Sequence, residues 1–275
     1  MADIVIVGAG LAGTECAWQL AERGVSVRLI EQKPVSRTPA QHSDHMAELV
    51  CSNSFRGAAL HNAVGQLKEE MRRTGSLVMQ VGEAHQVPAG GAFAVDRDEF
   101  SAEITRRIEA HPLIEVVNEV VDRIPDARPV VIATGPLTSG GLADDIAAAV
   151  GAEHLAYYDA IAPIIAADSI NMDHCFFANR YEDQSDDYLN IPLSKEEYEN
   201  FVGAIAIAEM MPLHDFENTE YFEACLPIEV MVERGRETLR FGPMKPVGLI
   251  DPKTQRRAWA VLQMRRENAS GTMYS

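Results

Sequence analysis

The alternation of apolar and polar residues is clearest at the start of the chain. An apolar run over residues 4–7 predicts a buried strand, and apolar residues then recur at helical spacing over residues 11–20. A second apolar run over residues 25–30 predicts another strand, which ends on the acid Glu31. This order of strand, glycine-rich turn, helix, strand and acid is typical of a βαβ unit that binds a dinucleotide.

The turn after the first predicted strand has the pattern Gly8-x-Gly10-x-x-Gly13. We expect Gly8 to permit a tight turn, Gly10 to let a pyrophosphate approach the backbone, and Gly13 to let helix and strand pack closely. The helix N-terminus would offer free N–H groups and a partial positive charge to the phosphates. Glu31 would accept hydrogen bonds from ribose hydroxyls, and its charge disfavours the 2′-phosphate of NADP. The predicted cofactor contacts are Gly8, Ala9, Gly10, Leu11, Ala12, Gly13 and Glu31.

The alternative is a glycine-rich turn that only helps packing. That interpretation does not explain why the second strand ends in an acid rather than in an apolar or small residue.

Strands and helices continue to alternate up to residue 150. Residues 32–57 are rich in Ser, Pro and His without a clear period, which predicts a long loop of the kind that is usually functional. The other predicted elements are helices over 60–73, from Asp96 or Arg97 onward and over 139–150, and strands over 92–95, 114–117 and 129–135. Together they predict a Rossmann-like α/β domain with a parallel sheet over residues 1–150.

The pattern changes after residue 151. A helix begins at Ser194, where Ser194 and Glu197 form a capping-box motif. Short strands are predicted over 157–170, 173–180, 188–191 and 258–265, with a hairpin of two strands over 226–244. We therefore expect an α+β insertion or substrate domain over residues 151–275. No second glycine-rich unit follows, so we expect the C-terminal return to the first domain to be missing and the chain to be a fragment.

Composition limits the classes of function. Of the 275 residues, 47% are hydrophobic and 24% are charged, as in ordinary soluble domains. No apolar run approaches the roughly 20 residues that span a bilayer, so no membrane partner is expected. Four cysteines without a CxxC pair predict a reducing, cytoplasmic setting rather than disulfides or zinc. His42 and His45 lack a third ligand at a useful spacing, so no metal site is predicted.

The cysteines differ in their sequence neighbours. Cys51 lies in the long loop among polar residues and near Arg56, a setting that favours a reactive thiolate, although a free cysteine is more usually a small buried apolar residue. Cys225 has apolar neighbours, which by themselves favour packing. Cys16 and Cys175 are also predicted to be packing residues.

Seven segments spread along the chain together resemble the folate- and FAD-dependent tRNA (uracil-5-)-methyltransferases, the TrmFO family. The two cysteine segments are the most specific of them, and the resemblance covers the N-terminal part of a typical member. The segments are GAGLAG at 8–13, AELVCSNSFR at 47–56, VDRDEF at 95–100, IATGPLTS at 132–139, YFEACLPIEVM at 221–231, LRFGPMKPVGL at 239–249 and QMRRENASGT at 263–272.

The resemblance implies methylation of C5 of the T-loop uridine of tRNA. The carbon would come from 5,10-methylenetetrahydrofolate, with reduced FAD as methylene carrier and reductant and NADH or NADPH as the source of electrons. It also implies that Cys51 and Cys225 are the catalytic pair, one adding to uracil C6 and the other acting as acid and base; we favour Cys225 as the nucleophile, but the assignment stays open.

The resemblance assigns further residues to ligand sites. Thr134 and Gly135 are expected to lie against the flavin. Arg97 is expected near the cofactor, with a surface charge at a helix start as the alternative. Lys245, Arg265 and Asn268 are candidates for the folate or substrate site, and each is equally consistent with an ordinary turn or strand-end residue.

The net charge of −17 argues against binding to RNA, because phosphates are repelled by an acidic surface. The basic pairs are either solvated faces or local phosphate contacts, and a basic surface outside this chain or an acid-rich proteome would also explain the charge. These pairs are Arg72-Arg73, Arg106-Arg107, Arg256-Arg257 and Arg265-Arg266. Two other functions compete: a relative that modifies wobble uridines, which would lack the paired cysteine segments, and a flavin- or nucleotide-binding module without catalysis.

Overall fold

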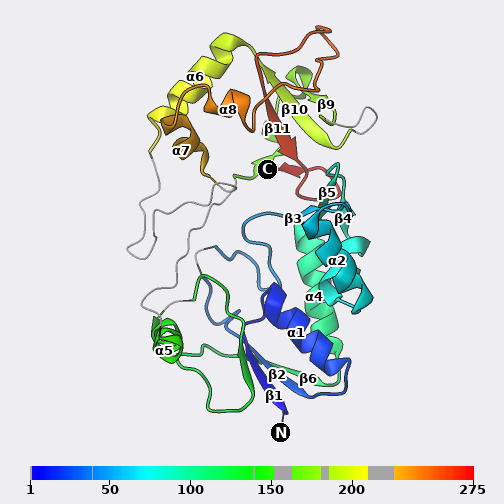
Figure 1. Ribbon diagram of the computed structural model, residues 1–275, viewed down its shortest axis with the longest axis vertical. Coiled ribbons are helices and arrows are strands. Elements are labelled where there is room, and N and C mark those ends of the chain that lie inside the picture. Colours follow the sequence, from blue (N-terminus) through cyan, green and yellow to red (C-terminus); the bar gives the residue numbers. More distant parts are fainter. Residues whose placement is uncertain (1, 39, 139, 152–162, 181–185, 210–225) are drawn as a thin grey trace. The chain divides into compact units, whose positions relative to one another are not determined.

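The computed structural model describes residues 2–38, 40–138, 140–151, 163–180, 186–209 and 226–275 (Figure 1). The chain divides into two compact units. Unit 1 comprises Met1–Gln86 and Phe93–Tyr157, and unit 2 comprises Val87–Ala92 and Tyr158–Ser275. The sequence-based boundary between residues 150 and 151 stays a prediction.

Unit 1 is built on a parallel sheet with the strand order β6-β2-β1-β7. Its first strand, β1, pairs with β2 on one side and with β7 on the other, and β2 pairs with β6, all in parallel. The strands are β1 (Ile4–Val7), β2 (Val27–Glu31), β6 (Ile114–Asn118) and β7 (Val130–Ile132). This is the order of a dinucleotide-binding half, and it confirms the predicted Rossmann-like α/β class.

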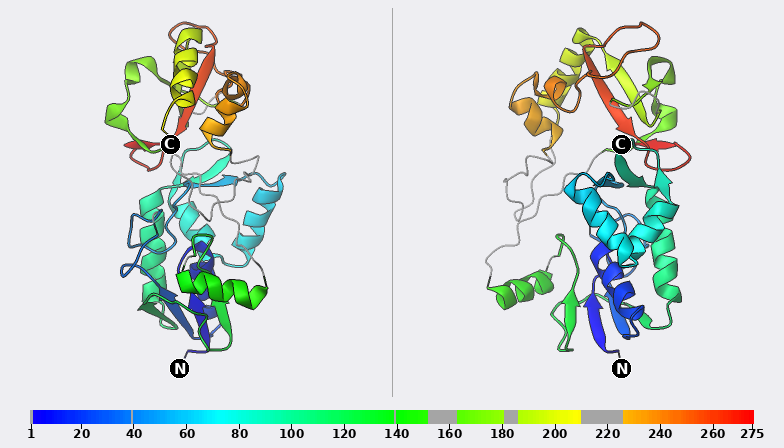
Figure 2. Two further views of the ribbon diagram at one scale, coloured as in Figure 1. Left: turned by 90° about the vertical axis from the view of Figure 1, so that its left-hand side faces the viewer. Right: turned by 45° about the vertical axis from the view of Figure 1, so that its right-hand side comes forward.

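The helices α1, α3 and α4 of unit 1 bury their apolar faces against this sheet and against one another. α1 contacts β1, β2 and β6, and α3 packs against both α1 and α4 (Figure 2). The helices are α1 (Leu11–Ala21), α2 (Ala63–Arg73), α3 (Leu77–Ala84), α4 (Arg97–Ala110) and α5 (Gly140–Val150). The core contains Ile6, Leu29, Phe100 and Ile104, each with no exposed surface.

A small second sheet has the order β3-β5-β4, formed by β3 (Ser54–Gly57), β4 (Gln86–Val87) and β5 (Ala92–Val95).

Unit 2 contains a three-stranded antiparallel sheet with the order β11-β10-β9. Its elements are β8 (Ile165–Ala166), the 3-10 turns η1 (Ala167–Ser169) and η2 (Met172–His174), β9 (Phe176–Phe177), β10 (Tyr188–Leu193), α6 (Lys195–Ala206), α7 (Ile228–Glu233), α8 (Thr238–Phe241), β11 (Ala260–Arg265) and β12 (Met273–Tyr274). The capping box predicted at the start of α6 is present, because the Ser194 side chain accepts from the Glu197 N–H and the Glu197 carboxylate accepts from the Ser194 N–H.

The hairpin predicted over 226–244 is wrong, because the described part of this segment forms the helices α7 and α8. Its valines suggested a strand, but packing overrides that local preference. Val232 and Leu239 are buried in one cluster with Tyr198 of α6. Only Phe176–Phe177 of the predicted strand over 173–180 is a strand. Of the predicted strand over 157–170, residues 157–162 lie outside the described residues, and in the remainder only Ile165–Ala166 forms a strand, β8. No helix in the described parts of the chain is long and apolar enough to cross a membrane.

Candidate functional site

The glycine turn after β1 is shaped by close contacts with the backbone. Gly8 has a φ of +96°, and a Cβ there would lie 2.6 Å from the carbonyl oxygen of Ala133. A Cβ at Gly13 would lie 1.8 Å from the carbonyl oxygen of Gly8, so only glycine fits between the turn and α1. Gly10 is different, because a Cβ there would meet no atom within 4 Å. The middle glycine therefore borders open space, while the other two are required by packing.

The N-terminus of α1 has no capping side chain. Gly10 is its N-cap residue, and the first turn of the helix contains no acidic residue. The other helices of unit 1 that have a described N-cap, α2, α3 and α4, are each capped by a side chain, from Asn62, Ser76 and Asp96 respectively. Free N–H groups beside an exposed glycine fit a phosphate, which is the arrangement a dinucleotide requires. Of the two predicted contacts in this turn of helix, Ala12 is exposed and Leu11 packs against the core.

Glu31 joins the glycine turn to the end of β2. Its carboxylate is buried and accepts hydrogen bonds from two backbone N–H groups, that of Ala9 at 2.7 Å and that of Lys33 at 3.0 Å. The carbonyl oxygen of Ala9 in turn accepts from the N–H of Ala47 at 2.9 Å. Ala9 therefore links the glycine turn, Glu31 and the loop that carries Cys51. The bonds expected from Glu31 to ribose hydroxyls stay a prediction.

A buried ion pair organises the same loop. The Lys33 ammonium lies 3.0 Å from the Glu48 carboxylate, with side chains only 2% and 9% exposed. Lys33 also donates to the carbonyl oxygen of His45. The second oxygen of Glu48 accepts from the N–H groups of His42 and Ser43 at 2.7 and 3.0 Å. The sequence pattern did not predict this pair, although a lysine and an acid within a functional loop are a weak signal for it.

Cys51 lies at an exposed position in this loop. The backbone on both sides of it is held by hydrogen bonds. Before the cysteine, the Arg97 guanidinium donates to the carbonyl oxygen of Leu49. After it, the buried Asn53 exchanges bonds with Val95, its side chain donating at 2.9 Å and its carbonyl oxygen accepting at 3.0 Å. The partners Val95 and Arg97 flank the start of α4. Arg97, expected near the cofactor, is thus seen in contact with the Cys51 loop.

The other described thiols are less available. Cys175 is 8% exposed in the core of unit 2, and Cys16 packs against the core of unit 1, as expected. Burial raises the pKa of both thiols, which keeps them protonated and poorly nucleophilic near neutral pH. Cys225 lies outside the described residues. Among the cysteines that the structure describes, Cys51 is the exposed one.

Thr134 and Gly135 follow β7 next to the glycine turn. A Cβ at Gly8 would lie 2.8 Å from Cα of Thr134, so the end of β7 touches the turn. The Thr138 hydroxyl lies 2.6 Å from the Thr134 hydroxyl and 2.7 Å from the carbonyl oxygen of Gly135. This small-residue segment thus borders the space in front of α1, where its predicted contact with a flavin would be made.

The remaining candidates lie in unit 2. Lys245 lines a hollow together with Arg240 and Trp259. Asn268 closes a turn, because its side chain accepts from the Thr272 N–H at 3.0 Å and donates to the Thr272 hydroxyl at 2.7 Å. That contact supports the alternative of an ordinary turn residue. No group of three metal-binding side chains occurs among the residues with a described placement.

Comparisons with known proteins agree with the fold and with the motifs. A family model described as glucose inhibited division protein A matches residues 3–275. Curated proteins named methylenetetrahydrofolate–tRNA-(uracil-5-)-methyltransferase TrmFO are 57% identical over 273 residues in Geobacter sulfurreducens and 54% identical over 272 residues in Heliobacterium modesticaldum. These alignments cover 99% of this chain but 63% and 62% of the relatives, so the chain spans less than two thirds of their length.

A solved structure of GidA from Aquifex aeolicus has a TM-score of 0.59 to this chain at 10% sequence identity, covering 99% of this chain and 49% of that one. This likeness shows a shared fold. The resemblance to TrmFO proteins inferred from the motifs is confirmed by the identity of the curated relatives, and the match of the family model over nearly every residue shows that the chain belongs to the glucose inhibited division protein A family.

Proposed function

We propose that this chain carries the FAD site and the two catalytic thiols, Cys51 and Cys225, of a cytoplasmic tRNA (uracil-5-)-methyltransferase. Its carbon donor would be 5,10-methylenetetrahydrofolate, its electrons would come from NADH or NADPH, and its target would be the T-loop uridine. The observation that carries the proposal is the link through Ala9, which joins the glycine turn to Glu31 and to the Cys51 loop. The names of the TrmFO relatives support the same activity.

The residues around the turn fit an FAD dinucleotide. Gly10 and the uncapped N-terminus of α1 would receive the pyrophosphate, and Glu31 would hold the adjacent ribose. Thr134 and Gly135 would let the flavin pass close to the end of β7. Bound FAD, once reduced, would supply electrons and carry the one-carbon unit.

The reaction explains why exposed thiols are needed. Uracil C5 is a poor nucleophile, and addition of a thiolate to C6 gives C5 the character of an enolate carbon. A base must then remove the proton from C5 before the thiolate can leave. In our proposal Cys225 is the nucleophile and Cys51 is the acid and base, held in place through Leu49 and Asn53.

Cysteine variants test this proposal. The purified chain and its Cys51→Ala, Cys225→Ala and Cys175→Ala variants are compared for the visible absorbance of oxidised flavin and for transfer of labelled carbon to an unmodified tRNA transcript. We expect all four to keep the flavin. Cys51→Ala and Cys225→Ala should lose carbon transfer, whereas the buried Cys175→Ala control should retain it.

The possible outcomes separate the alternatives. Full carbon transfer by both Cys51→Ala and Cys225→Ala would exclude the thiol mechanism. If the protein without substitutions retained flavin but transferred no carbon to tRNA, the result would favour a nucleotide-binding module without catalysis. Absence of flavin would contradict the cofactor assignment.

A further inference from the structure

The charge along the chain is unevenly distributed. Residues 234–266 contain nine of the 24 lysines and arginines but only two of the 41 acidic residues. This segment therefore has a net charge of +7 in a chain whose net charge is −17. A local excess of this size attracts an anionic partner even when the whole protein is acidic.

The arginine pairs of unit 1 and unit 2 differ in their ion pairing. In unit 1, both arginines of each pair lie within 4.0 Å of glutamates: Arg72 with Glu69 and Glu83, Arg73 with Glu69, and Arg106 and Arg107 with Glu103. In unit 2, Arg256 and Arg257 are exposed, and no described carboxylate forms an ion pair with either of them. Each arginine of the unit 1 pairs therefore has a carboxylate partner, whereas Arg256 and Arg257 add to the positive potential.

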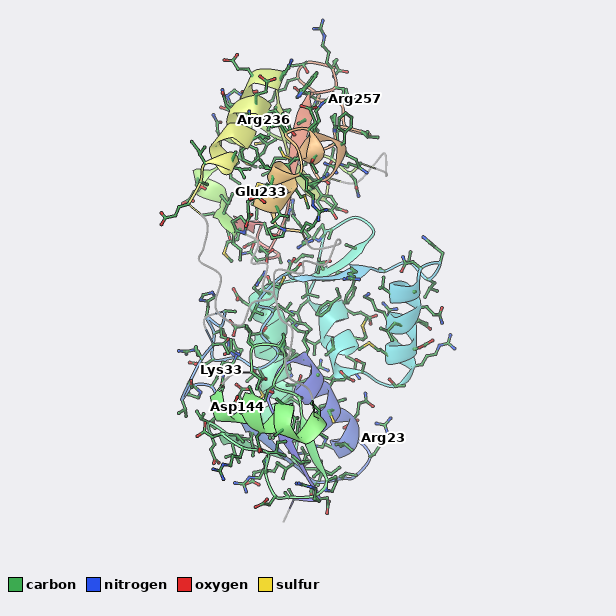
Figure 3. All side chains as sticks on the ribbon, turned by 60° about the vertical axis from the view of Figure 1, so that its left-hand side comes forward. Arg23, Lys33, Asp144, Glu233, Arg236 and Arg257 are labelled. Carbon is green, nitrogen blue, oxygen red and sulfur yellow. The ribbon has the colours of Figure 1, made fainter. Side chains whose placement is uncertain are left out.

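Arg257, which Figure 3 labels, also borders a hollow in unit 2. The volume of this hollow, about 420 Å³, is within the usual size range of small-ligand sites. Three of its lining residues are basic, two are aromatic, and none is acidic; these five are Arg240, Lys245, Arg257, Phe241 and Trp259. We call this hollow the Phe241 pocket. Its composition fits a ligand that has both a negative charge and a flat ring.

The aromatic side chains of the Phe241 pocket are arranged for different roles. The Arg240 guanidinium lies 3.7 Å from the centre of the Trp259 ring and donates to the Trp259 carbonyl oxygen at 3.1 Å. Trp259 and the Glu237 carboxylate, which lies 3.1 Å from the same guanidinium, therefore hold Arg240 in place, and the proposed phosphate contacts are those of Lys245 and Arg257. The Arg240 guanidinium also lies 5.0 Å from the centre of the Phe241 ring, but Phe241 is 74% exposed, and it is the one exposed aromatic residue in the described parts of the chain. An exposed ring beside cations is a platform on which a base can stack.

We propose that the Phe241 pocket binds one nucleotide of the RNA substrate, with the base stacked on Phe241 and the phosphate held by Lys245 and Arg257. This inference rests on the proposed function for its choice of RNA. Recognition of RNA uses unstacked bases on aromatic rings together with cations on the backbone. A lipid surface fits less well, because binding in a membrane interface uses the apolar face of a long amphipathic helix, whereas Phe241 ends the four-residue helix α8.

Binding of a fluorescein-labelled, unmodified tRNA transcript, followed by fluorescence anisotropy at several salt concentrations, tests the inference. Phe241→Leu keeps an apolar side chain but removes the ring, and it should weaken binding roughly 5- to 150-fold. Phe241→Trp keeps a stacking surface and should bind like the unmodified sequence. Arg257→Ala should reduce the slope of log affinity against log salt by about one, because one phosphate contact is lost.

Matched controls separate local contacts from general effects. Ile207→Ala removes another exposed apolar side chain of unit 2, which is 87% exposed. Arg73→Ala removes an equal charge from a neutralised pair in unit 1. Both should leave the affinity and the salt slope unchanged. Thermal unfolding followed by circular dichroism should be the same for all variants, since the altered side chains are exposed.

Each outcome decides the proposal. If the protein without substitutions binds tRNA and the Phe241→Leu and Arg257→Ala variants bind it equally well, the inference is wrong while the proposed function stands. If the protein without substitutions does not bind tRNA, the inference and the proposed function are both wrong for this chain. Binding to phosphatidylglycerol vesicles that is lost in Arg257→Ala, without binding to tRNA, would assign the surface to a membrane and overturn the inference.

Discussion

The buried ion pair between Lys33 and Glu48 is expected to stabilise the loop that carries Cys51. Lys33→Met removes the cation and leaves a carboxylate that is 9% exposed with only two backbone N–H groups as partners. Breaking a buried pair from one side typically costs about 3–5 kcal/mol. We expect this loss in the free energy of unfolding of unit 1, because the orphaned charge must be desolvated without its partner.

Urea denaturation followed by the fluorescence of Trp18 in a Trp259→Phe background measures unit 1 alone, since the chain has two tryptophans. The control is Arg73→Met, whose ion pair with Glu69 is at the surface and should contribute no more than about 1 kcal/mol.

A second variant isolates the charge from the packing. Glu48→Gln added to Lys33→Met should recover part of the lost stability, because neutral glutamine still accepts from the loop N–H groups. If Lys33→Met cost no more than Arg73→Met, the buried pair would not hold the loop and this account of its order would be refuted.

Three further predictions follow from single sites. Gly13→Ala should destabilise unit 1 in the same urea assay, because the added Cβ would lie 1.8 Å from a backbone oxygen; unchanged stability would contradict the packing role. The hydrogen bonds from Arg106 and Arg107 lower the pKa of Glu103 from 4.5 to about 2. Glu103→Gln should therefore lower the free energy of unfolding at neutral pH, and its difference from the unsubstituted protein should vanish as the pH falls from about 4.5 to about 2. A difference that persisted below pH 2 would oppose this. At neutral pH an alkylating reagent should label Cys51 before Cys16 and Cys175, as peptide mass spectrometry would report, whereas faster labelling of Cys16 or Cys175 would contradict the order of exposure.

The elements that the sequence predicted well are those set by local rules. The glycine turn and its flanking strands follow from an apolar run, a turn that only glycine can adopt at Gly8, and a helix of regular period. The capping box at Ser194 is likewise a local motif. Residues 226–244 were misjudged because valines favour strands locally, whereas burial of Val232 and Leu239 against α6 decides their structure.

The contacts of the candidate site depend on pairings that no local pattern encodes. Lys33 and Glu48 are 15 residues apart in a loop without a period, so their ion pair could not be read from the chain. Arginine pairs look alike in sequence, yet those at 72–73 and 106–107 meet glutamates while Arg257 does not. The partners of these side chains are therefore set by the fold and not by a local sequence pattern.

The affinity of Gly10→Ala for FAD tests the central claim most directly. The added methyl group would meet no protein atom within 4 Å, so the free energy of unfolding in the absence of FAD should change by less than about 1 kcal/mol. It would occupy the space proposed for the pyrophosphate, so FAD titration followed by flavin fluorescence should show binding at least about tenfold weaker. A folded Gly10→Ala protein that binds FAD with an unchanged dissociation constant would contradict the placement of the cofactor over this turn.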